Sequence, residues 1–316
     1  MRRLAIDSPG LLDLPEPGRL SPLLARLIAR ARPAGAAGEV PLAVPLGLSS
    51  EAAAGPLSRL AVEPGSSLPR EDRESAWVRF DAVTLVPDLT AVWLREPQRV
   101  DFPSAAGGGL AEELARMFEA HGLEWWRPEA TPGFGLLRVP RDAPLPRFVP
   151  ADAARGRRLD EILPTGDDAA RWRSLINESQ MVFHQVRGVL RGTDRGAGLW
   201  FWGAGVLPER TRSGAAVAVV SSEDDVVHRG LARWARATAP ERAERVGVHW
   251  PVAGARDPAA ALAELEHRWL APAWSALRRF RLERLALADT GRCLELTPLD
   301  SWSAWRRSPG RAAVGS

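Results

Sequence analysis

The sequence contains no lysine and no tyrosine, so all 42 of its basic residues are arginines. Without lysine, Schiff-base catalysis and the lysine of a phosphate-binding P-loop are both excluded. The single cysteine, Cys293, excludes a disulfide framework and a cysteine-based zinc site within one chain, and it is expected to be a small buried hydrophobe. The high isoelectric point, near 10.4 at a formal charge of only +3, reflects the shortage of groups that titrate above neutral pH.

Long apolar runs are also missing from the chain. No run approaches ~18 apolar residues, and the segment MRRLAIDSPGLLDLPEPG carries no continuous apolar stretch after its two arginines. We therefore expect no secretion signal, no membrane span and a cytoplasmic location. The 316 residues, of which 45% are hydrophobic, suffice for one large domain or for two joined lobes.

Histidines are few, and none occurs in a pattern typical of metal ligands. Metal-dependent phosphoryl transfer needs clustered aspartates and histidines beside a nucleophile, yet the chain has no H-x-H, D-H or H-E-x-x-H pair. The nearest candidate pairs Asp224 with His228 after the run AVAVVSS, where Ser221 or Ser222 and the following acids fit a helix start better. We therefore expect no metal site and no cofactor. The histidines are His121, His184, His228, His249 and His267.

Strand-like and helix-like segments alternate along the chain. This alternation predicts a mixed α/β fold in which a partly parallel sheet is flanked by helices, with a smaller α+β lobe. The proline-rich stretch 140–150 is the expected seam between an N-terminal α+β lobe, 1–150, and a C-terminal α/β lobe, 151–316. Ser21 with Pro22 is expected to start a helix that runs to about residue 32, and further helices are expected at 110–121, up to 237, and as a long final helix kinked at Pro272. Strands 76–86 and 91–95 are expected to pair across a Pro-Asp-Leu-Thr turn. Further strands are expected at 134–139, 199–202, 215–220, 246–252, 282–288 and 292–297.

A long amphipathic helix in the second half of the chain offers the first candidate binding site. Apolar residues recur every three or four positions from Trp172 to Leu190, and Thr165 with Asp168 fits a capping box. A neighbouring stripe holds Asn177, Gln180 and His184 at i, i+3 and i+7, so the three side chains point in about the same direction. Such a stripe fits either a polar ligand or a polar seam between the helix and a sheet.

Two further candidates lie on predicted strands. The strand that ends at Trp202 is closed by Gly203 and Gly205, whose backbone could approach a ligand, although no helix follows at once and a dinucleotide or P-loop site is excluded. Arg79 and Asp81 share one side of their strand, where they either face a cleft or form a solvated cross-strand ion pair.

Four blocks of sequence resemble the RpfE-type regulatory proteins of gamma-proteobacteria and together span roughly the last three quarters of the chain. The blocks are WVRFDAVTLVPD, LDEILPTGDDAARWRSLINESQMVFH, LWFWGAGVLPE and LALADTGRCLELTPLDSWSAWRR. That family is similar in turn to archaeal-type cofactor-independent phosphoglycerate mutases. The resemblance implies an alkaline-phosphatase-superfamily-like fold in truncated form.

The chain departs from the family pattern directly after its long helix. The family has a second histidine two residues after the position that His184 occupies, followed by Pro-Val-Asn, whereas this chain continues with Gln185 to Gly188 and a shorter loop. In the mutases an arginine near the position of Arg79 helps bind the phosphorylated substrate, so the resemblance implies an anion-binding role for that residue.

These observations favour a cytosolic protein without metal-dependent catalysis that binds a small molecule or a protein partner in a regulatory role. The first alternative is a metal-dependent phosphoglycerate mutase or phosphatase-like enzyme. The second is nucleic-acid binding, since arginines and the 13 tryptophans could stack on single strands, although no basic run or aromatic platform is visible.

Overall fold

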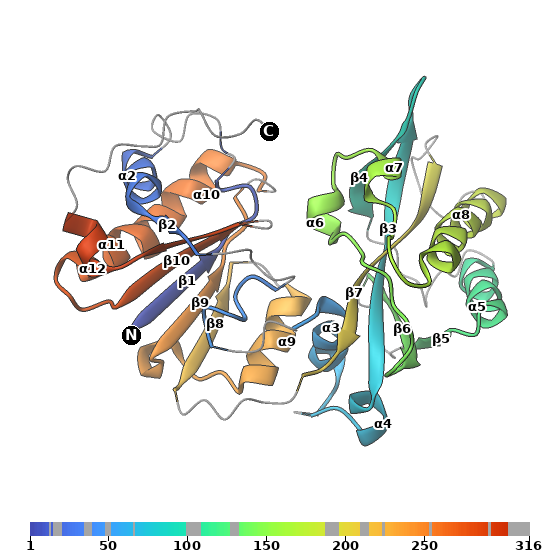
Figure 1. Cartoon of the computed structure of the whole chain (residues 1–316), viewed down its shortest axis with the longest axis horizontal. Coiled ribbons are helices and arrows are strands. Elements are labelled where there is room, and N and C mark those ends of the chain that lie inside the picture. Colours follow the sequence, from blue (N-terminus) through green and yellow to red (C-terminus); the bar gives the residue numbers. More distant parts are fainter. Residues whose placement is uncertain are drawn as a thin grey trace. The chain divides into compact units, whose positions relative to one another are not determined.

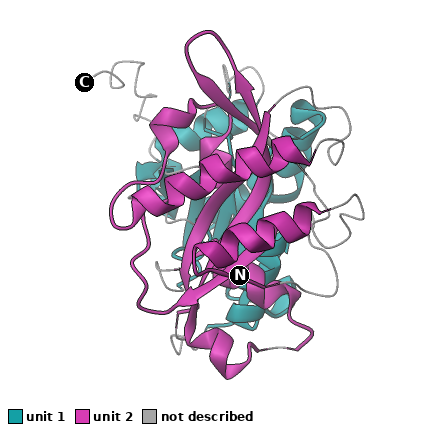
Figure 2. Ribbon diagram, turned by 90° about the vertical axis from the view of Figure 1, so that its right-hand side faces the viewer, with its two compact units in different colours: residues 1–51, 209–316 teal, residues 52–208 magenta. Residues whose placement is uncertain are grey.

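The chain divides into two compact units in the computed structural model (Figures 1 and 2). Unit 1 consists of residues 1–51 and 209–316, and unit 2 consists of residues 52–208. The structure describes residues 1–12, 14, 21–34, 40–47, 52–65, 67–98, 109–126, 133–186, 196–208, 215–222, 225–252, 255–289 and 292–302.

Unit 1 is organised around a six-stranded sheet in its described part, with the order β2-β11-β10-β1-β9-β8. Strands β10, β1, β9 and β8 run parallel, whereas β11 and β2 are added antiparallel at one edge. Parallel neighbours need long crossover connections, which here bring together strands more than two hundred residues apart. The strands are β1 (Arg3–Asp7), β2 (Arg32–Pro33), β8 (Val217–Ser221), β9 (Arg245–His249), β10 (Arg284–Asp289) and β11 (Arg292–Leu296).

Helices cover both faces of the unit 1 sheet (Figure 1). The main apolar core forms where alternate strand residues such as Ile6 and Val248 pack on α2 (Pro22–Arg30), α10 (Pro258–Leu265) and α11 (Ala271–Arg278). The opposite face carries α9 (Val226–Ala235). The short elements of unit 1 are the 3₁₀-helix η1 (Pro240–Arg242), the π-helix η2 (Glu266–Leu270) and α12 (Pro298–Trp302).

Unit 2 holds an antiparallel sheet centred on its longest strand, β3 (Ser75–Pro87). One edge of β3 pairs with β7 (Gly196–Val206), and the other edge is shared by β6 (Gly135–Pro140) and β4 (Val92–Gln98). Strand β5 (Glu124–Trp126) extends the sheet beyond β6.

Two longer helices of unit 2, α5 (Leu110–Ala120) and α8 (Ala169–Gln185), run side by side across one face of this sheet (Figure 2). Their aromatic residues Phe118 and Trp172 meet the ring of Phe201 at centroid distances of 6.3 and 5.3 Å, which fixes the helices on the sheet. Helix α3 (Ala54–Val62) contacts β3 and β7. The short helices are α4 (Arg70–Arg73), α6 (Ala151–Ala154) and α7 (Leu159–Ile162).

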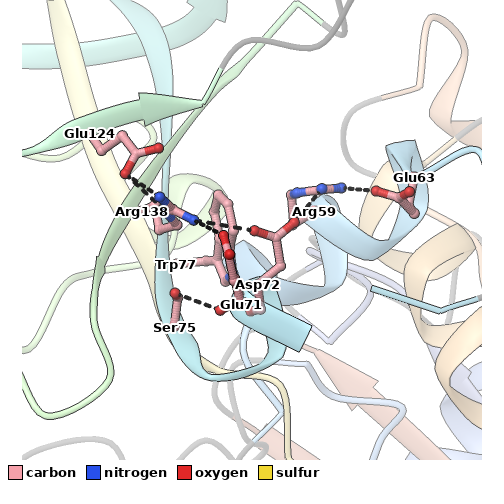
Figure 3. Close-up of polar contacts among 8 residues, drawn as sticks. All are labelled: Arg59, Glu63, Glu71, Asp72, Ser75, Trp77, Glu124 and Arg138. Carbon is pink, nitrogen blue, oxygen red and sulfur yellow. Dashed lines mark hydrogen bonds and ion pairs between the residues drawn. The ribbon is translucent and has the colours of Figure 1, made fainter. Parts of the chain in front are cut away.

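A buried charge network joins α3, α4 and the sheet of unit 2 (Figure 3). The guanidinium of Arg59 pairs with Asp72 and, at 2.7 Å, with Glu63, and it lies 3.9 Å from the ring centre of Trp126. The indole of Trp77 donates to the backbone carbonyl of Asp72 at 2.9 Å. Because a buried charge without a partner is costly, these contacts fix the helix ends against the strands. Arg138 extends the network to Glu124 at 2.6 Å and to Glu71 at 3.6 Å.

The structure confirms the expected mixed α/β class with a partly parallel sheet flanked by helices. The helix that Ser21 was expected to start is confirmed as well, since the hydroxyl of Ser21 accepts a hydrogen bond from the amide of Leu24 at 2.8 Å. The division of the chain differs from the boundary expected at residue 150. The stretch 140–150 joins β6 to α6 within unit 2, whereas unit 1 combines both ends of the chain.

One local expectation about helices is wrong. Thr165 does not cap α8, because the helix begins only at Ala169: Thr165 pairs with Arg147 through its backbone amide and carbonyl, and Asp168 precedes the helix in a left-handed conformation without a capping hydrogen bond. The final helix contains the π-helical segment η2 directly before α11, and Pro272 lies in the first turn of α11. The kink expected at Pro272 stays a prediction.

Membrane insertion was not expected from the sequence. None of the helices among the described residues combines the length and the apolar character that crossing a bilayer requires.

Gly135 provides a test of how tightly the core of unit 2 is packed. A β-carbon at this position would lie 1.8 Å from Cζ of Phe80, whose ring is fully buried among other aromatic rings. We expect Gly135→Ala to lower the free energy of unfolding by about 3 kcal/mol, because the ring cannot move aside without straining the core. Urea unfolding followed by tryptophan fluorescence measures this change. Gly65→Ala is the control, because an added β-carbon there would meet only the carbonyl oxygen of Ser67, at an ordinary contact distance of 3.9 Å, and an equal loss of stability in both variants would contradict the packing argument.

Candidate metal centre

The carboxyl ends of the parallel strands in unit 1 bring a carboxylate and an imidazole side by side. Asp7, the last residue of β1, is in direct register with His249, the last residue of β9, so both side chains lie on the same face of the sheet. Nδ1 of His249 lies 3.0 Å from Oδ2 of Asp7. In open α/β sheets ligands bind outside the carboxyl ends of the strands, which is where this pair lies.

A second imidazole reaches this pair from the first turn of α9. Asp225 caps the helix by accepting a hydrogen bond from the amide of His228 at 2.8 Å, and its carboxylate also lies 2.7 Å from Nδ1 of the same residue. Nε2 of His228 is 3.5 Å from Oδ2 of Asp7. The result is a chain of alternating acids and imidazoles in the order Asp225, His228, Asp7, His249.

The ligand atoms of Asp7, His228 and His249 converge, and all three side chains are buried. One atom from each lies within 4.8 Å of the other two, which is a group that could hold a metal ion. The two imidazole rings are stacked, with centroids 3.9 Å apart and planes inclined by 16°. Within the described part of the chain, Oδ1 of Asp7 and Nε2 of His228 have no hydrogen-bond partner, nor does the hydroxyl of neighbouring Ser8. Buried polar atoms without partners are rare in folded proteins, and an ion or ligand is one explanation for them.

The loop that follows Asp7 is fixed by a third strand. Asp289, at the end of β10, accepts hydrogen bonds from the amides of Gly10 at 2.7 Å and Leu12 at 2.9 Å. This carboxylate is itself almost fully buried. Asp7 is therefore held by its strand on one side and by an anchored turn on the other.

Burial and mutual charge set the protonation states of the cluster. Burial alone would lower the pKa of His228, but its close contacts with the carboxylates of Asp225 and Asp7 outweigh it and raise that pKa to about 9. Burial also opposes ionisation of Asp7, yet its contacts with the imidazoles of His228 and His249 bring its pKa below the usual range. The pKa of Asp225 is lowered for the same reason, by its contact with His228. At neutral pH the metal-free cluster therefore carries a proton on His228 between two carboxylates.

The polar stripe expected on α8 lies in unit 2 and does not form a common site in the described structure. Asn177 and His184 are exposed, whereas Gln180 is half-buried and its amide donates to the carbonyl of Ile176 at 3.4 Å. The residue of α8 that bonds to the sheet is Ser179, whose hydroxyl accepts from the amide of Leu199 at 2.9 Å. A ligand role for the stripe stays a prediction.

Arg79 and Asp81 do form an ion pair, but it is buried and lies within one strand. The guanidinium of Arg79 meets Asp81 through two hydrogen bonds of 2.9 and 3.1 Å, and only 13% and 7% of the two side chains are exposed. The indole of Trp202 donates to the same carboxylate at 2.5 Å, and the hydroxyl of Ser58 lies 3.3 Å from the guanidinium. The charge of Arg79 is thus balanced by a neighbouring residue, and its role toward an anion stays a prediction.

The glycines of β7 allow a helix to approach the strand closely. Gly203 has a positive φ of 69°, and its carbonyl oxygen would lie 2.5 Å from a β-carbon added to Gly55 of α3. A β-carbon on Gly205 would lie 2.8 Å from that of Ala53. The observed neighbours of both glycines are therefore protein atoms of unit 2.

The converging residues were not predicted from the sequence, and the expectation that its acids and histidines do not cluster is wrong. Asp7, His228 and His249 are far apart in the sequence, so no spacing motif joins them. The available signal was local: an apolar strand ends in Asp7 before a Ser-Pro-Gly turn, and another ends in His249. The expected cap by Ser221 or Ser222 is wrong, because α9 begins at Val226 and its cap is Asp225, while Asp224 lies outside the described residues.

Comparisons with known proteins show only a distant structural similarity. No protein-family model and no curated protein sequence match the chain. Among solved structures, the cofactor-independent phosphoglycerate mutase from Thermoplasma acidophilum DSM 1728 is similar over 94% of this chain and 89% of that chain, with 14% sequence identity and a TM-score of 0.40. A similarity of this degree carries no argument about the site, and kinship with the RpfE-type family stays a prediction.

The raised pKa of His228 predicts how stability depends on pH in metal-free protein. Because the folded state binds this proton more tightly than the unfolded state, the stabilisation is present below pH 6.5 and is lost as the pH rises through about 9. We expect urea unfolding in a chelating buffer to show a loss on the order of 2 kcal/mol over this window. His228→Gln should remove most of the slope, whereas His121→Gln, in unit 2, should retain it. An unchanged slope in His228→Gln would refute the assignment.

Proposed function

We propose that unit 1 binds a divalent transition-metal ion through Asp7, His228 and His249 and that the chain is a metal-dependent hydrolytic or phosphoryl-transfer enzyme. The observation that supports this proposal is the convergence of one carboxylate and two imidazoles, with unpartnered buried atoms, at the carboxyl ends of parallel strands. Two nitrogens and one oxygen form a donor set that suits zinc and related ions, and three protein ligands are typical of catalytic rather than structural zinc sites.

The observed distances fit the chemistry of such an ion. Ligand atoms bound at ~2.0–2.1 Å in a tetrahedral arrangement lie ~3.3 Å apart. The Asp7 carboxylate is 3.0 Å from His249 and 3.5 Å from His228, close to this separation. The two ring planes are nearly parallel and offset, and an imidazole binds an ion in its own plane, so joint ligation requires one imidazole to turn.

Asp225 is the residue that would orient His228 toward an ion. Metal-ligating histidines usually donate their second ring N–H to a carboxylate, which fixes the tautomer and raises the basicity of the ligating nitrogen. The 2.7 Å contact between Asp225 and Nδ1 of His228 leaves Nε2 directed at Asp7. The contact that would orient His228 toward an ion is therefore already formed.

A bound ion would supply a Lewis acid and would lower the pKa of a coordinated water. The chain's own residues hold the acid and imidazole groups in place, and burial reduces competition from bulk water. Phosphate esters are the first substrates to test, because the sequence resembles a family related to phosphoglycerate mutases. The regulatory role expected from the sequence stays a prediction.

Metal binding is tested by isothermal titration of chelator-treated protein with Zn²⁺ and Mn²⁺, together with elemental analysis of the purified chain. We expect one ion per chain, and Asp7→Asn and His249→Gln should each weaken binding by at least a hundredfold. His121→Gln is the matched control, since this histidine also contacts a carboxylate, Glu178 at 3.0 Å, but lies in unit 2 outside the cluster. Equal affinity in wild type and Asp7→Asn would end the proposal.

The enzymatic part of the proposal has a separate readout. Metal-loaded protein is assayed with p-nitrophenyl phosphate and with 3-phosphoglycerate, and turnover should disappear in Asp7→Asn while persisting in His121→Gln. Stoichiometric metal without turnover on either substrate would leave a metal-binding protein and would remove the phosphoryl-transfer assignment.

The role of Asp225 predicts an intermediate phenotype. Asp225→Asn keeps a hydrogen-bonding group of the same size but loses the negative charge that polarises His228. We expect metal affinity to fall 10- to 100-fold, less than for Asp7→Asn, as is typical when a residue behind a ligand is changed. Titration at a fixed pH measures this, and a loss as large as that of Asp7→Asn would instead make Asp225 a direct ligand.

A further inference from the structure

The C-terminal end of α11 displays an exposed phenylalanine on a strained backbone. Phe280 follows the helix with a φ of 56°, and 64% of the residue is exposed. Its amide donates to the carbonyl of Leu277 at 3.0 Å, and the next amide, that of Arg281, donates to the carbonyl of Ala276 at 2.8 Å. This pair of hydrogen bonds closes helices that usually have glycine in the place of Phe280, because a β-carbon crowds the backbone there. Phe280 is therefore placed at a cost to the backbone and with little gain in core packing.

Three exposed arginines surround this phenylalanine in the sequence, Arg278, Arg279 and Arg281. None of them forms an ion pair with a carboxylate of the described residues. Glu283 is exposed close by in the chain, whereas Asp300 of α12 is only 2% exposed and already binds another arginine. Positive charge is thus in excess at this end of the helix.

A second exposed ring joins the arginines through the packing of α12 on α11 (Figure 1). The guanidinium of Arg278 lies 4.8 Å from the ring centre of Trp302, which is 54% exposed. A guanidinium that stacks on an aromatic face keeps the donors at its edge for another partner. The result is a surface on which charges and rings alternate. We call it the α11–α12 surface, and it consists of Arg278, Arg279, Phe280, Arg281 and Trp302.

We propose that the α11–α12 surface binds single-stranded nucleic acid. Phosphates would pair with Arg279 and Arg281, because the planar guanidinium matches two phosphate oxygens at once. Bases would stack on Phe280 and Trp302, since every base has a flat face. Strained backbone is found most often at functional sites, and here the strain serves to display a ring rather than to pack it.

The alternation of rings and charges favours a single strand over other polyanions. A duplex encloses the faces of its bases and offers only groove edges and phosphates, so two exposed rings would have no partner in it. A membrane surface is bound by a continuous apolar face, whereas arginines separate Phe280 from Trp302 here. An acidic peptide would match the charge but supplies no regular series of flat faces.

This surface lies away from the metal centre and does not depend on it. Phe280 precedes β10, and the amide of Glu283 donates to the carbonyl of Arg2, just before β1, at 2.8 Å. The α11–α12 surface is therefore next to the amino ends of the parallel strands, whereas the metal centre is at their carboxyl ends. Binding is measured in the presence of a chelator, so failure of one proposal leaves the other unaffected.

The test is fluorescence anisotropy of a labelled DNA single strand of about 15 nucleotides, titrated with the whole chain at several salt concentrations. A strand of equal length that carries abasic sugars presents the same phosphates without bases. We expect the intact strand to bind with a slope of about −2 in a plot of log affinity against log salt, as for three neutralised phosphates. The abasic strand should bind at least fivefold more weakly, because stacking is lost.

Phe280→Gly separates a binding role from a structural one. The change removes the ring and relieves the backbone, so the Tm should rise while affinity for the intact strand falls about fivefold. The advantage of the intact strand over the abasic strand should shrink in the same variant. Arg279→Gln and Arg281→Gln should each make the salt slope shallower by about 0.7, since each removes one phosphate contact.

Arg236→Gln is the matched control. Arg236 is also an exposed arginine with a positive φ, 51°, at the end of a helix, but that helix is α9 on the opposite face of the sheet. This variant should keep the affinity and the salt slope of the wild type. The proposal is overturned by absence of binding at low salt, by equal affinity for the intact and abasic strands, by unchanged affinity in Phe280→Gly, or by tighter binding to phosphatidylserine vesicles than to the strand.

Discussion

The parallel pairing of β1 with its two neighbours is the constraint on which unit 1 depends. Strand β1 lies between β10 and β9, so one register fixes both the apolar face, with Leu4 and Ile6, and the polar end, with Asp7. A slip by one residue would move Leu4 and Ile6 to the opposite face of the sheet and turn the carboxylate into the main apolar core, which makes the register strongly specified. The register that forms the hydrophobic core therefore also fixes Asp7 beside His249.

The cluster that this register creates in unit 1 alternates carboxylates with imidazoles, and Asp7, His228 and His249 are buried. Four ionisable groups without partners would be expensive to bury, but each acid here contacts an imidazole and His228 contacts two acids. The same arrangement can be neutralised either by a proton on His228 or by a cation. A proton and a metal ion would thus compete for the same lone pair, so metal affinity would rise as the pH increases.

Local sequence patterns were sufficient for most individual elements of the fold. Ser21 before a proline marked α2, and the turn at Asp88 marked the hairpin of β3 and β4, where the carboxylate accepts from the amides of Thr90 and Ala91. These signals act over a few residues, and the physical cause is present in the segment itself. The mixed sheet followed from the alternation of such segments.

The features that the sequence did not predict depend on competing contacts or on residues that lie far apart in the chain. Thr165 has the sequence of a cap, but its backbone bridges to that of Arg147 and the helix begins only at Ala169. The expected boundary at residue 150 reflected a run of prolines, whereas the observed division follows long-range strand pairing. The metal-binding geometry depends on the same pairing, since residues 7 and 249 meet only after the sheet has formed.

The division of the chain has a consequence for biosynthesis. Unit 2 is continuous, so every strand of its sheet has been translated once residue 208 has been added, and it can fold while the ribosome is still at work. Strand β1 is made first but finds its partners β9 and β10 last. During that interval β1 has no partner for its hydrogen-bonding edges, and unit 1 cannot complete its sheet.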